Sequence, residues 1–198
     1  MTENEIREFY NCGAEKYASM HPPGENSDVV YLQNSLPDHN PRVLDVGCGC
    51  GSWAGYFQAE KYIGLDIAEK MLEMGRGFWP KRTFVQGAAT RLPFPEESFG
   101  GVVATCSFPH LSHEETVMAV KEIHRVLVRG GVCLLALSCT PRKSHVYEVV
   151  SDYNGKPFQI MSYSQSDAAL LARSAGFRTF HANMYLSHGL ASLFLIKK

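Results

Sequence analysis

The stretch VLDVGCGCGSW, residues 43–53, decides the fold, because an apolar run typical of a buried strand is followed at once by three glycines in five positions. Gly47, Gly49 and Gly51 allow a sharp turn and leave backbone N–H groups uncovered by any Cβ atom. A turn of this kind, placed between a strand and the start of a helix, is suited to binding a nucleotide-like ligand. The stretch therefore predicts a strand, a ligand-binding loop and a helix.

Short apolar runs alternate with amphipathic stretches along the rest of the chain. Strands are expected at 42–46, 62–67, 83–87, 99–106 and 130–138, in a stretch that follows Gly176, and at 189–198. A repeated strand–helix order predicts a parallel sheet with helices packed against it. The expected fold class is therefore α/β.

Local residue patterns predict several helix boundaries. Ser112 and Glu115 have the spacing of a capping box, and Gly130 is expected to end the helix that they begin. In the last helix, Leu170 and Leu171 are both expected to face inward. The first helix is expected at 3–20, followed by an irregular stretch HPPGENSD.

Length, composition and charge limit the class of protein. The chain has 198 residues, of which 45% are hydrophobic and 20% charged, and its net charge is −1. These values predict one globular domain, and the scattered Lys and Arg residues argue against a nucleic-acid partner. No apolar run approaches the roughly 20 residues that span a bilayer, and the start resembles no signal peptide, so we expect no membrane association. The six cysteines are expected to be reduced, in a cytoplasmic monomer or homodimer.

Two acids next to the glycines indicate the ligand. The glycines follow a G-x-G-x-G pattern, and Ser52 stands where the dinucleotide-binding fingerprint has its last glycine. Asp45 would repel a pyrophosphate but attract an ammonium or sulfonium group. Asp66 ends the second strand, where a carboxylate commonly accepts hydrogen bonds from ribose hydroxyls. Together these features predict an adenosine with a positively charged amino-acid tail, as in S-adenosylmethionine (SAM).

At this point the sequence resembles the class I SAM-dependent methyltransferases, in particular the small-molecule ubiquinone/menaquinone methyltransferase-like group, also known as methyltransferase type 11. The resemblance covers roughly residues 40–140 and includes four ordered motifs: VLDVGCGCG, YIGLDIAEKML, FVQGAATRLPFPEESFGGVVATCSFPHL and EIHRVLVRGG. It implies a single Rossmann-like domain with a seven-stranded, mostly parallel sheet and helices on both faces. It also implies SAM as the cofactor and a small molecule as the methyl acceptor.

The resemblance divides the chain into functional parts. The expected parts are an N-terminal helical cap at 1–40, a SAM-binding core at 41–139, a substrate-side excursion at 140–165, and the last helix and C-terminal strands at 166–198. The excursion and the N-terminal cap interrupt the regular alternation, so we expect them to enclose the acceptor.

The resemblance also assigns residues to the cofactor. By it, Asp45, Gly47 and Gly49 would hold the methionine part, and Asp66 the ribose. Ile67 and Met71 would contact the adenine face, and the backbone of Ala88 and Ala89 its edge. The full set expected at the cofactor is Tyr10, Tyr17, Asp45, Gly47, Cys48, Gly49, Asp66, Ile67, Met71, Gly87, Ala88, Ala89, Thr105 and Cys106.

The sequence departs from the family pattern at two positions. Family members often carry acids where Ala88 and Gly100 stand, so adenine binding is expected to be weaker here. This departure keeps open a catalytically silent SAM-binding protein as an alternative function. A nicotinamide-dependent oxidoreductase is a further alternative, disfavoured by Ser52 and Asp45.

The expected chemistry is in-line transfer of the sulfonium methyl group to a small nucleophile, without a metal. His110 is the leading candidate for a general base, because it follows the fourth strand at the carboxyl edge of the sheet and imidazole titrates near neutral pH. Tyr17 and His145 are the reserve candidates, one from each covering segment.

Each candidate also has a simpler interpretation. Tyr10 and Tyr17 could form an ordinary core-facing row on the first helix, and His110 could be a packing residue. The cysteines on either side of Gly49 could form a redox-active or arsenic-handling pair, but we interpret them as small side chains tolerated in a tight loop. Cys106, His110 and His113 lie close together in sequence, yet no second ligand pair supports a metal site.

Overall fold

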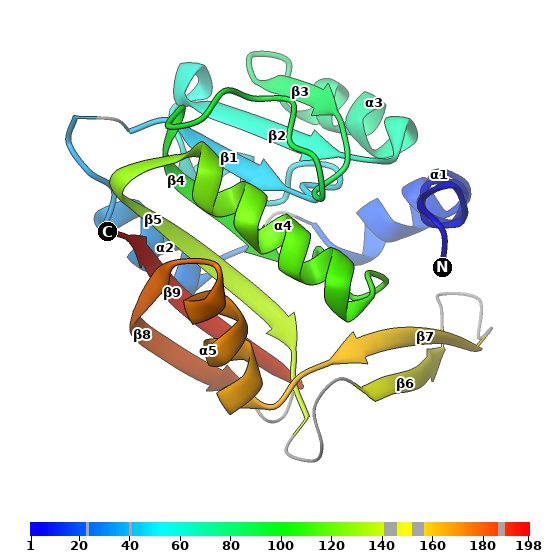
Figure 1. Ribbon diagram of the computed structural model, residues 1–198. Helices are drawn as coiled ribbons and strands as arrows, with labels where there is room; N and C mark the ends of the chain where they lie inside the picture. The colour runs from blue at the N-terminus through cyan, green and yellow to red at the C-terminus, as the bar shows by residue number, and fades with distance from the viewer. Residues whose placement is uncertain (23, 40, 141–145, 152–156, 186–188) are drawn as a thin grey trace.

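The alternating strands and helices build one seven-stranded sheet in the computed structural model, which describes residues 1–22, 24–39, 41–140, 146–151, 157–185 and 189–198. The strand order is β3-β2-β1-β4-β5-β9-β8 (Figure 1). Neighbouring strands from β3 to β5 pair in parallel, whereas β9 is antiparallel to both β5 and β8. The strands are β1 (Val43–Val46), β2 (Tyr62–Asp66), β3 (Thr83–Gln86), β4 (Phe99–Thr105), β5 (Leu127–Ser138), β8 (Phe177–Tyr185) and β9 (Leu190–Lys197). The predicted α/β class and the seven-stranded, mostly parallel sheet are confirmed.

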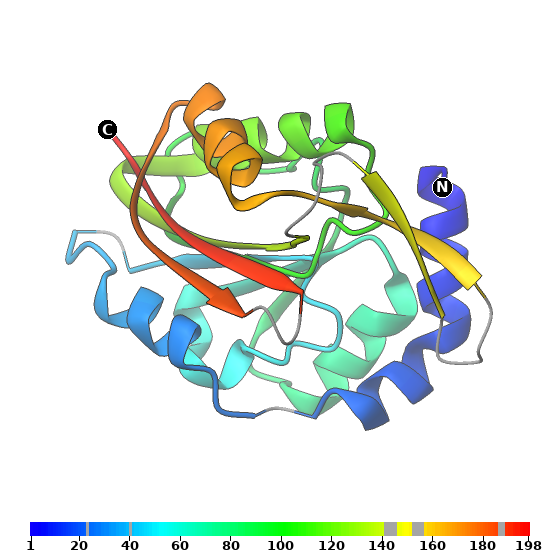
Figure 2. The same ribbon diagram turned by 90° about the horizontal axis from the view of Figure 1, so that it is seen from below.

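Helices cover both faces of this sheet, as Figure 2 shows edge-on. The helices are α1 (Glu3–Met20), α2 (Ser27–Asn34), α3 (Glu69–Phe78), α4 (His113–Val126) and α5 (Gln165–Ser174). Apolar side chains of α4 and α5 pack on one face, and those of α2 and α3 pack on the other. Successive residues of β1 alternate between the two clusters, with Val43 in the cluster beside α2 and Leu44 in the cluster beside α4. The domain therefore has the three layers typical of doubly wound α/β folds.

The first helix has the predicted bounds, and a capping box fixes its start. The Thr2 side chain accepts a hydrogen bond from the backbone of Glu5, whose own side chain accepts one from Thr2. The same device starts α4, where Ser112 and Glu115 make the predicted capping box. These ends are set by local hydrogen bonds, which explains why the sequence alone predicts them.

The prediction for Gly130 is wrong. Helix α4 ends at Val126, and β5 begins at the next residue, so Gly130 lies inside the strand with φ +74°. Leu127 already pairs with Phe99, after which the register between β4 and β5 shifts. Pairing with β4 therefore starts β5 before the glycine. Gly130 lies in the irregular part of this strand and does not end the helix.

The prediction for the segment after the glycine loop also needs correction. Two short 3₁₀ turns, η1 (Ala54–Tyr56) and η2 (Ala59–Lys61), stand where a helix was expected. Only a short stretch separates β1 from β2, and Trp53 already makes a tertiary hydrogen bond to Thr105, 2.7 Å from Nε1 to Oγ1. Tertiary contacts thus take the place of a regular helix here.

Two further expectations about helices were wrong. The stretch HPPGENSD is not irregular to its end, because Asn26 caps α2 by accepting hydrogen bonds from the backbone of Asp28 and Val29. In α5, Leu171 is buried as predicted, but Leu170 is 59% exposed. Adjacent helical residues point about 100° apart, so only one of the two leucines can face the sheet directly.

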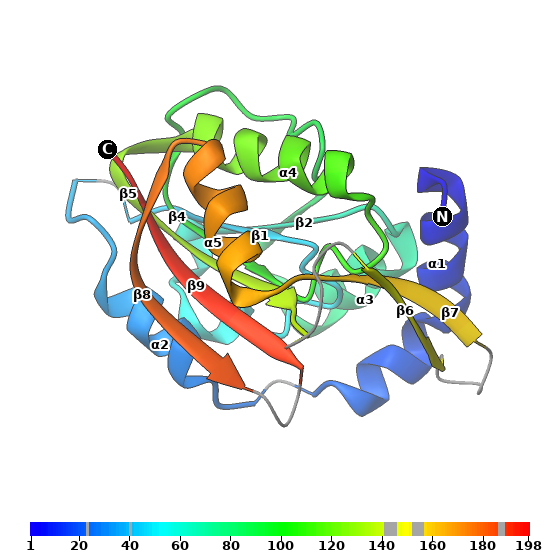
Figure 3. The same ribbon diagram turned by 60° about the horizontal axis from the view of Figure 1, so that its bottom comes forward.

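The predicted ligand-binding edge of the sheet is covered by the first helix and by a pair of strands from the C-terminal half of the chain. Figure 3 shows α1 and the paired strands β6 (Val146–Ser151) and β7 (Pro157–Ser162) beyond the arrowheads of the parallel strands. Strand β7 is joined to the loop after β4, since the backbone N–H of Met161 donates to the carbonyl of Pro109 at 2.7 Å. None of the helices in the described parts of the chain is both long and apolar enough to cross a membrane.

Candidate functional site

The glycine loop is the centre of the candidate site. Gly47, Gly49 and Gly51 all have positive φ angles, of 69°, 53° and 80°, in the region that side chains rarely adopt. The backbone N–H groups of Gly47 and Cys48 donate to the carbonyl of Leu65, at 2.7 and 3.0 Å. The loop is therefore held against the end of β2, in a conformation that favours glycine.

Asp66 connects the loop to the next helix. Its Oδ2 accepts a hydrogen bond from the Gly49 N–H, and its Oδ1 accepts one from the Ala68 N–H, both at 2.9 Å. Burial raises the pKa of the carboxyl group, while these backbone hydrogen bonds oppose the rise. Because each carboxylate oxygen can accept more than one hydrogen bond, Asp66 can still serve a ligand while it supports the loop.

The ends of β3 and β4 form the neighbouring walls. The Gly87 N–H donates to the carbonyl of Asp66 at 3.0 Å, which brings the chain after β3 against β2. At the end of β4, Cys106 has a φ angle of 54°, one of two non-glycine residues with positive φ in the described part of the chain. A backbone conformation of this kind costs free energy and is found preferentially at functional sites.

Helix α1 covers the loop. An ideal Cβ atom on Gly49 would lie 3.4 Å from the Tyr17 ring, so this ring lies directly over the loop. The Tyr17 ring also stacks on His21, with ring centroids 4.2 Å apart, and meets the Tyr10 ring edge-on. Ala14, Cys50 and Met71 share a small apolar cluster that holds α1 against the loop and α3.

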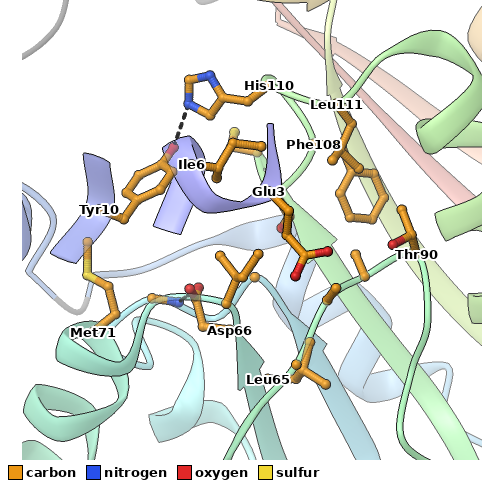
Figure 4. A pocket seen from close by; sticks show the side chains of 18 of the residues that line it. Glu3, Ile6, Tyr10, Leu65, Asp66, Met71, Thr90, Phe108, His110 and Leu111 are labelled. Atoms are coloured by element: carbon orange, nitrogen blue, oxygen red, sulfur yellow. Dashed lines mark hydrogen bonds between the residues drawn. The ribbon is translucent and has the colours of Figure 1, made fainter. Parts of the chain in front are cut away.

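His110 links helix α1, which covers the loop, to the end of the sheet. Its Nε2 lies 3.0 Å from the hydroxyl of Tyr10, which Figure 4 shows as a dashed line between the two side chains. The imidazole is 5% exposed, and burial lowers its pKa to about 4, against an opposing hydrogen bond to the backbone of Gln159. His110 is therefore neutral at physiological pH and able to accept a hydrogen bond or a proton.

These elements enclose one pocket, whose polar lining has a definite charge character. Among the described residues that line it, Glu3, Asp66 and Glu115 carry carboxylates and none carries an ammonium or guanidinium group. Such a lining favours a ligand with positive charge and disfavours a pyrophosphate.

Most of the predicted site residues meet in this pocket. Those that line it are Tyr10, Tyr17, Gly47, Gly49, Asp66, Ile67, Met71, Gly87, Ala88, Ala89, Thr105, Cys106 and His110. Two predicted residues, Asp45 and Cys48, are absent from the described lining, and His145 lies outside the described residues.

Asp45 lies behind the loop. Its Oδ2 accepts a hydrogen bond from the Tyr62 hydroxyl at 2.8 Å, and its side chain is 1% exposed. Burial raises its pKa to about 7, although the bond from Tyr62 opposes the rise. The side chain was expected to contact the ligand, but it is buried against Tyr62 on the same side of β1 as Val43 and is absent from the described lining.

The two loop cysteines belong to different apolar clusters. Cys48 packs with Tyr62 and other residues beneath the sheet, whereas the Cys50 sulfur lies 3.5 Å from that of Met71. Both thiols are free, and burial raises both pKa values, that of Cys50 to about 11. These surroundings favour the interpretation of small packing side chains over that of a reactive pair.

Several residues that line the pocket were not predicted from the sequence. They are Glu3, Ile6, Leu65, Thr90, Ser107, Phe108, Leu111 and Glu115. Ile6 lies one turn before Tyr10 on the same helix, and helical spacing could have suggested it. Ser107 and Phe108 lie between Cys106 and His110, so their proximity in sequence was a signal. No local pattern pointed to Glu3.

A metal site finds no support in the part of the chain that the structure describes. No three side chains of His, Cys, Asp or Glu are grouped there in a way that could hold a metal ion. The alternative interpretation of Cys106, His110 and His113 as ligands therefore has no geometric basis among the described residues.

Comparisons with known proteins point in the same direction as the pocket. Residues 43–131 match a family described as a methyltransferase domain. The chain is 31% identical over 110 residues to a demethylmenaquinone methyltransferase of Chlorobaculum tepidum, covering 54% of this chain and 45% of that protein. It is 33% identical over 153 residues to an uncharacterized methyltransferase of Bacillus subtilis, covering 73% of this chain and 60% of the relative. The chain thus spans about half the length of the curated relatives it matches.

The fold is shared with solved methyltransferase structures. A SAM-dependent methyltransferase from Thermotoga maritima superposes with a TM-score of 0.70 at 20% sequence identity, over 98% of this chain and 99% of that one. At this level of identity the match establishes the fold.

Proposed function

The chain belongs to the class I SAM-dependent methyltransferases, and from this premise we propose that it transfers the methyl group of SAM to a nucleophilic atom of a small-molecule acceptor. The observation that carries the proposal is the pocket itself, in which the glycine loop lies beside three carboxylates, those of Glu3, Asp66 and Glu115, and whose described lining includes no Lys or Arg. Such a lining suits a sulfonium and an ammonium group, whereas a dinucleotide would bring a pyrophosphate to the same place.

The residues present fit this cofactor. The loop backbone at Gly47 and Gly49 would hold the methionine part, and the Asp66 carboxylate would accept from the ribose hydroxyls. Ile67 and Met71 supply apolar surface for the base. When bound, SAM would supply a methyl group on a sulfonium centre. The rest of the cofactor would leave as a neutral thioether, so the leaving group needs no general acid.

The chain's own contribution is alignment of the acceptor and exclusion of water. Tyr10, Tyr17 and Ile6 close the pocket from α1, so a nucleophile between α1 and the loop after β4 would be shielded from solvent. Holding the reacting atoms at about 3 to 3.5 Å is worth several kcal/mol of the barrier.

Proton removal is assigned to the Tyr10–His110 pair. We infer that the Tyr10 hydroxyl takes the proton of the acceptor as its own proton passes to Nε2 of the neutral His110 imidazole, so that the proton ends on His110. A base of low pKa is sufficient where the nucleophile is a hydroxyl group, because its oxygen becomes strongly acidic as it gains the methyl group. Tyr17 also lines the pocket and stays the reserve candidate.

The first test is identification of the ligand. Mass spectrometry of the protein as purified, followed by calorimetric titration with SAM, S-adenosylhomocysteine and NAD, should detect binding of the first two compounds alone. Binding of NAD without detectable binding of SAM would overturn the proposal and favour an oxidoreductase.

The second test follows identification of an acceptor from a metabolite pool with methyl-labelled SAM. His110→Gln and Tyr10→Phe should each lower turnover by roughly 10²-fold while SAM affinity changes by no more than a few fold. Turnover at the unaltered rate in both variants would mean that positioning alone carries the reaction.

A further inference from the structure

Glu3 is the one acidic side chain that the first turn of α1 contributes to the pocket lining described above. Figure 4 shows its carboxylate directed into the pocket, toward the side where Leu65 and Thr90 lie. A second hollow shares Glu3, Ile67, Gly87 and Ala88 with the pocket. Glu3 therefore lies against the chain that follows β3.

The sheet order determines which part of a nucleoside would reach that place. Strands β1, β2 and β3 are adjacent and parallel, so their carboxyl ends form one continuous edge. If the glycine loop after β1 holds the amino-acid part and Asp66 after β2 holds the ribose, the base continues in the same direction to the end of β3. This step rests on the proposed function.

The end of β3 offers little side-chain polarity of its own. Gly87, Ala88 and Ala89 have no polar side-chain atoms. A purine edge placed there would meet backbone groups, and the carboxylate that faces this position comes from Glu3. A carboxylate accepts hydrogen bonds only, so it favours an amino substituent on the base and disfavours a keto oxygen.

We propose that Glu3 accepts a hydrogen bond from the exocyclic amino group of the bound adenine, and so makes α1 a determinant of base specificity. The carboxylate has capacity for this contact in addition to its ion pair with Arg7, in which Oε1 lies 3.2 Å from the guanidinium. The capping box of α1 uses Thr2 and Glu5, which leaves Glu3 to face the pocket from a helix turn whose position is fixed.

The inference is tested with two ligands that differ by one amino group. S-adenosylhomocysteine and its analogue with purine in place of adenine are titrated calorimetrically into the unaltered protein, Glu3→Ala and Glu8→Ala. Glu8 is the matched control, because it is an exposed acid on the same helix and absent from the described pocket lining. Thermal melts check that all three proteins are folded.

Glu3→Ala should bind S-adenosylhomocysteine roughly five- to tenfold more weakly than the unaltered protein does. The effect is modest because the Glu3 side chain is half exposed. Its affinity for the purine analogue should stay within about twofold of that of the unaltered protein. Glu8→Ala should bind both ligands like the unaltered protein. An equal loss for both ligands, or no loss for either, would overturn the inference while the proposed function stands. Failure of the unaltered protein to bind S-adenosylhomocysteine would overturn both.

Discussion

Replacing Asp66 by alanine is expected to lower both the stability of the fold and its affinity for the cofactor. The carboxylate is 9% exposed and accepts hydrogen bonds from the backbone of Gly49 and Ala68, both at 2.9 Å. One of these bonds holds the glycine loop and the other the approach to α3. Alanine removes both acceptors and leaves two backbone donors in a largely buried position.

The size of the effect follows from these two bonds. A hydrogen bond to a charged acceptor contributes about 1.5 to 3 kcal/mol, so two such bonds would contribute about 3 to 6 kcal/mol. Burial of the charge opposes this gain, as the raised pKa of Asp66 shows. We therefore expect the free energy of unfolding to fall by about 3 kcal/mol, which corresponds to a decrease in Tm of roughly 6 to 12 °C for a chain of this length.

The affinity should fall as well, because the variant loses the acceptor for the ribose and support for the loop. We expect S-adenosylhomocysteine to bind at least roughly tenfold more weakly to folded Asp66→Ala. Calorimetry below the melting transition measures affinity, and a thermal melt measures stability. The control is Asp28→Ala, which removes another buried carboxylate, hydrogen-bonded to Asn183 at 2.7 Å and absent from the described pocket lining.

The control should lose stability but bind S-adenosylhomocysteine within about twofold of the unaltered protein. A folded Asp66→Ala protein with unchanged affinity would refute the role in ribose binding and leave only the structural role. Unchanged stability would refute the view that this carboxylate holds the loop.

Three other variants test separate parts of the structure. In calorimetry, the affinity of Gly49→Val for S-adenosylhomocysteine should fall by at least roughly tenfold, because φ is +53° and a Cβ atom would lie 3.4 Å from the Tyr17 ring. Unchanged affinity would contradict the placement of the ligand over the loop. The pKa of His110 is about 4 in the fold against 6.5 in the unfolded chain, so between these pH values the unfolded chain binds one more proton. Denaturant melts should therefore show that the free energy of unfolding falls as the pH drops from about 6.5 to 4, and that it falls less steeply in His110→Gln. Equal pH profiles of the two proteins would contradict the lowered pKa. In the same melts, Leu171→Ala should lower the free energy of unfolding by about 2 to 4 kcal/mol and Leu170→Ala by less than about 0.5 kcal/mol, since Leu171 is buried and Leu170 is exposed. Similar losses in the two variants would contradict the orientation of α5.

The sequence by itself determined the elements that depend on neighbours along the chain. The start of α1 and the start of α4 follow from hydrogen bonds between residues three apart, at Thr2 and Ser112. The strand before the glycine loop and the loop itself were equally readable, since Gly47 and Gly49 occupy positions with positive φ. Asp66 was predicted at the site because it ends a buried strand.

Strand pairing decided features that local patterns misplaced. Gly130 was expected to end a helix, but the pairing of Leu127 with Phe99 begins β5 earlier and puts the glycine inside the strand. Asp45 was expected to face the ligand, yet its side chain meets Tyr62 behind the loop. Which side of a strand faces the ligand depends on the layers packed against the sheet, and the sequence of one strand holds no information about them.

Only the tertiary structure brought together the two sides of the pocket. Tyr10 and His110 lie 100 positions apart in the chain, and their 3.0 Å contact exists because α1 returns over the carboxyl ends of the strands. Glu3 reaches the chain after β3 in the same way. Local periodicity predicts which residues of a helix share a face, but the partner that this face meets is chosen by packing between distant segments.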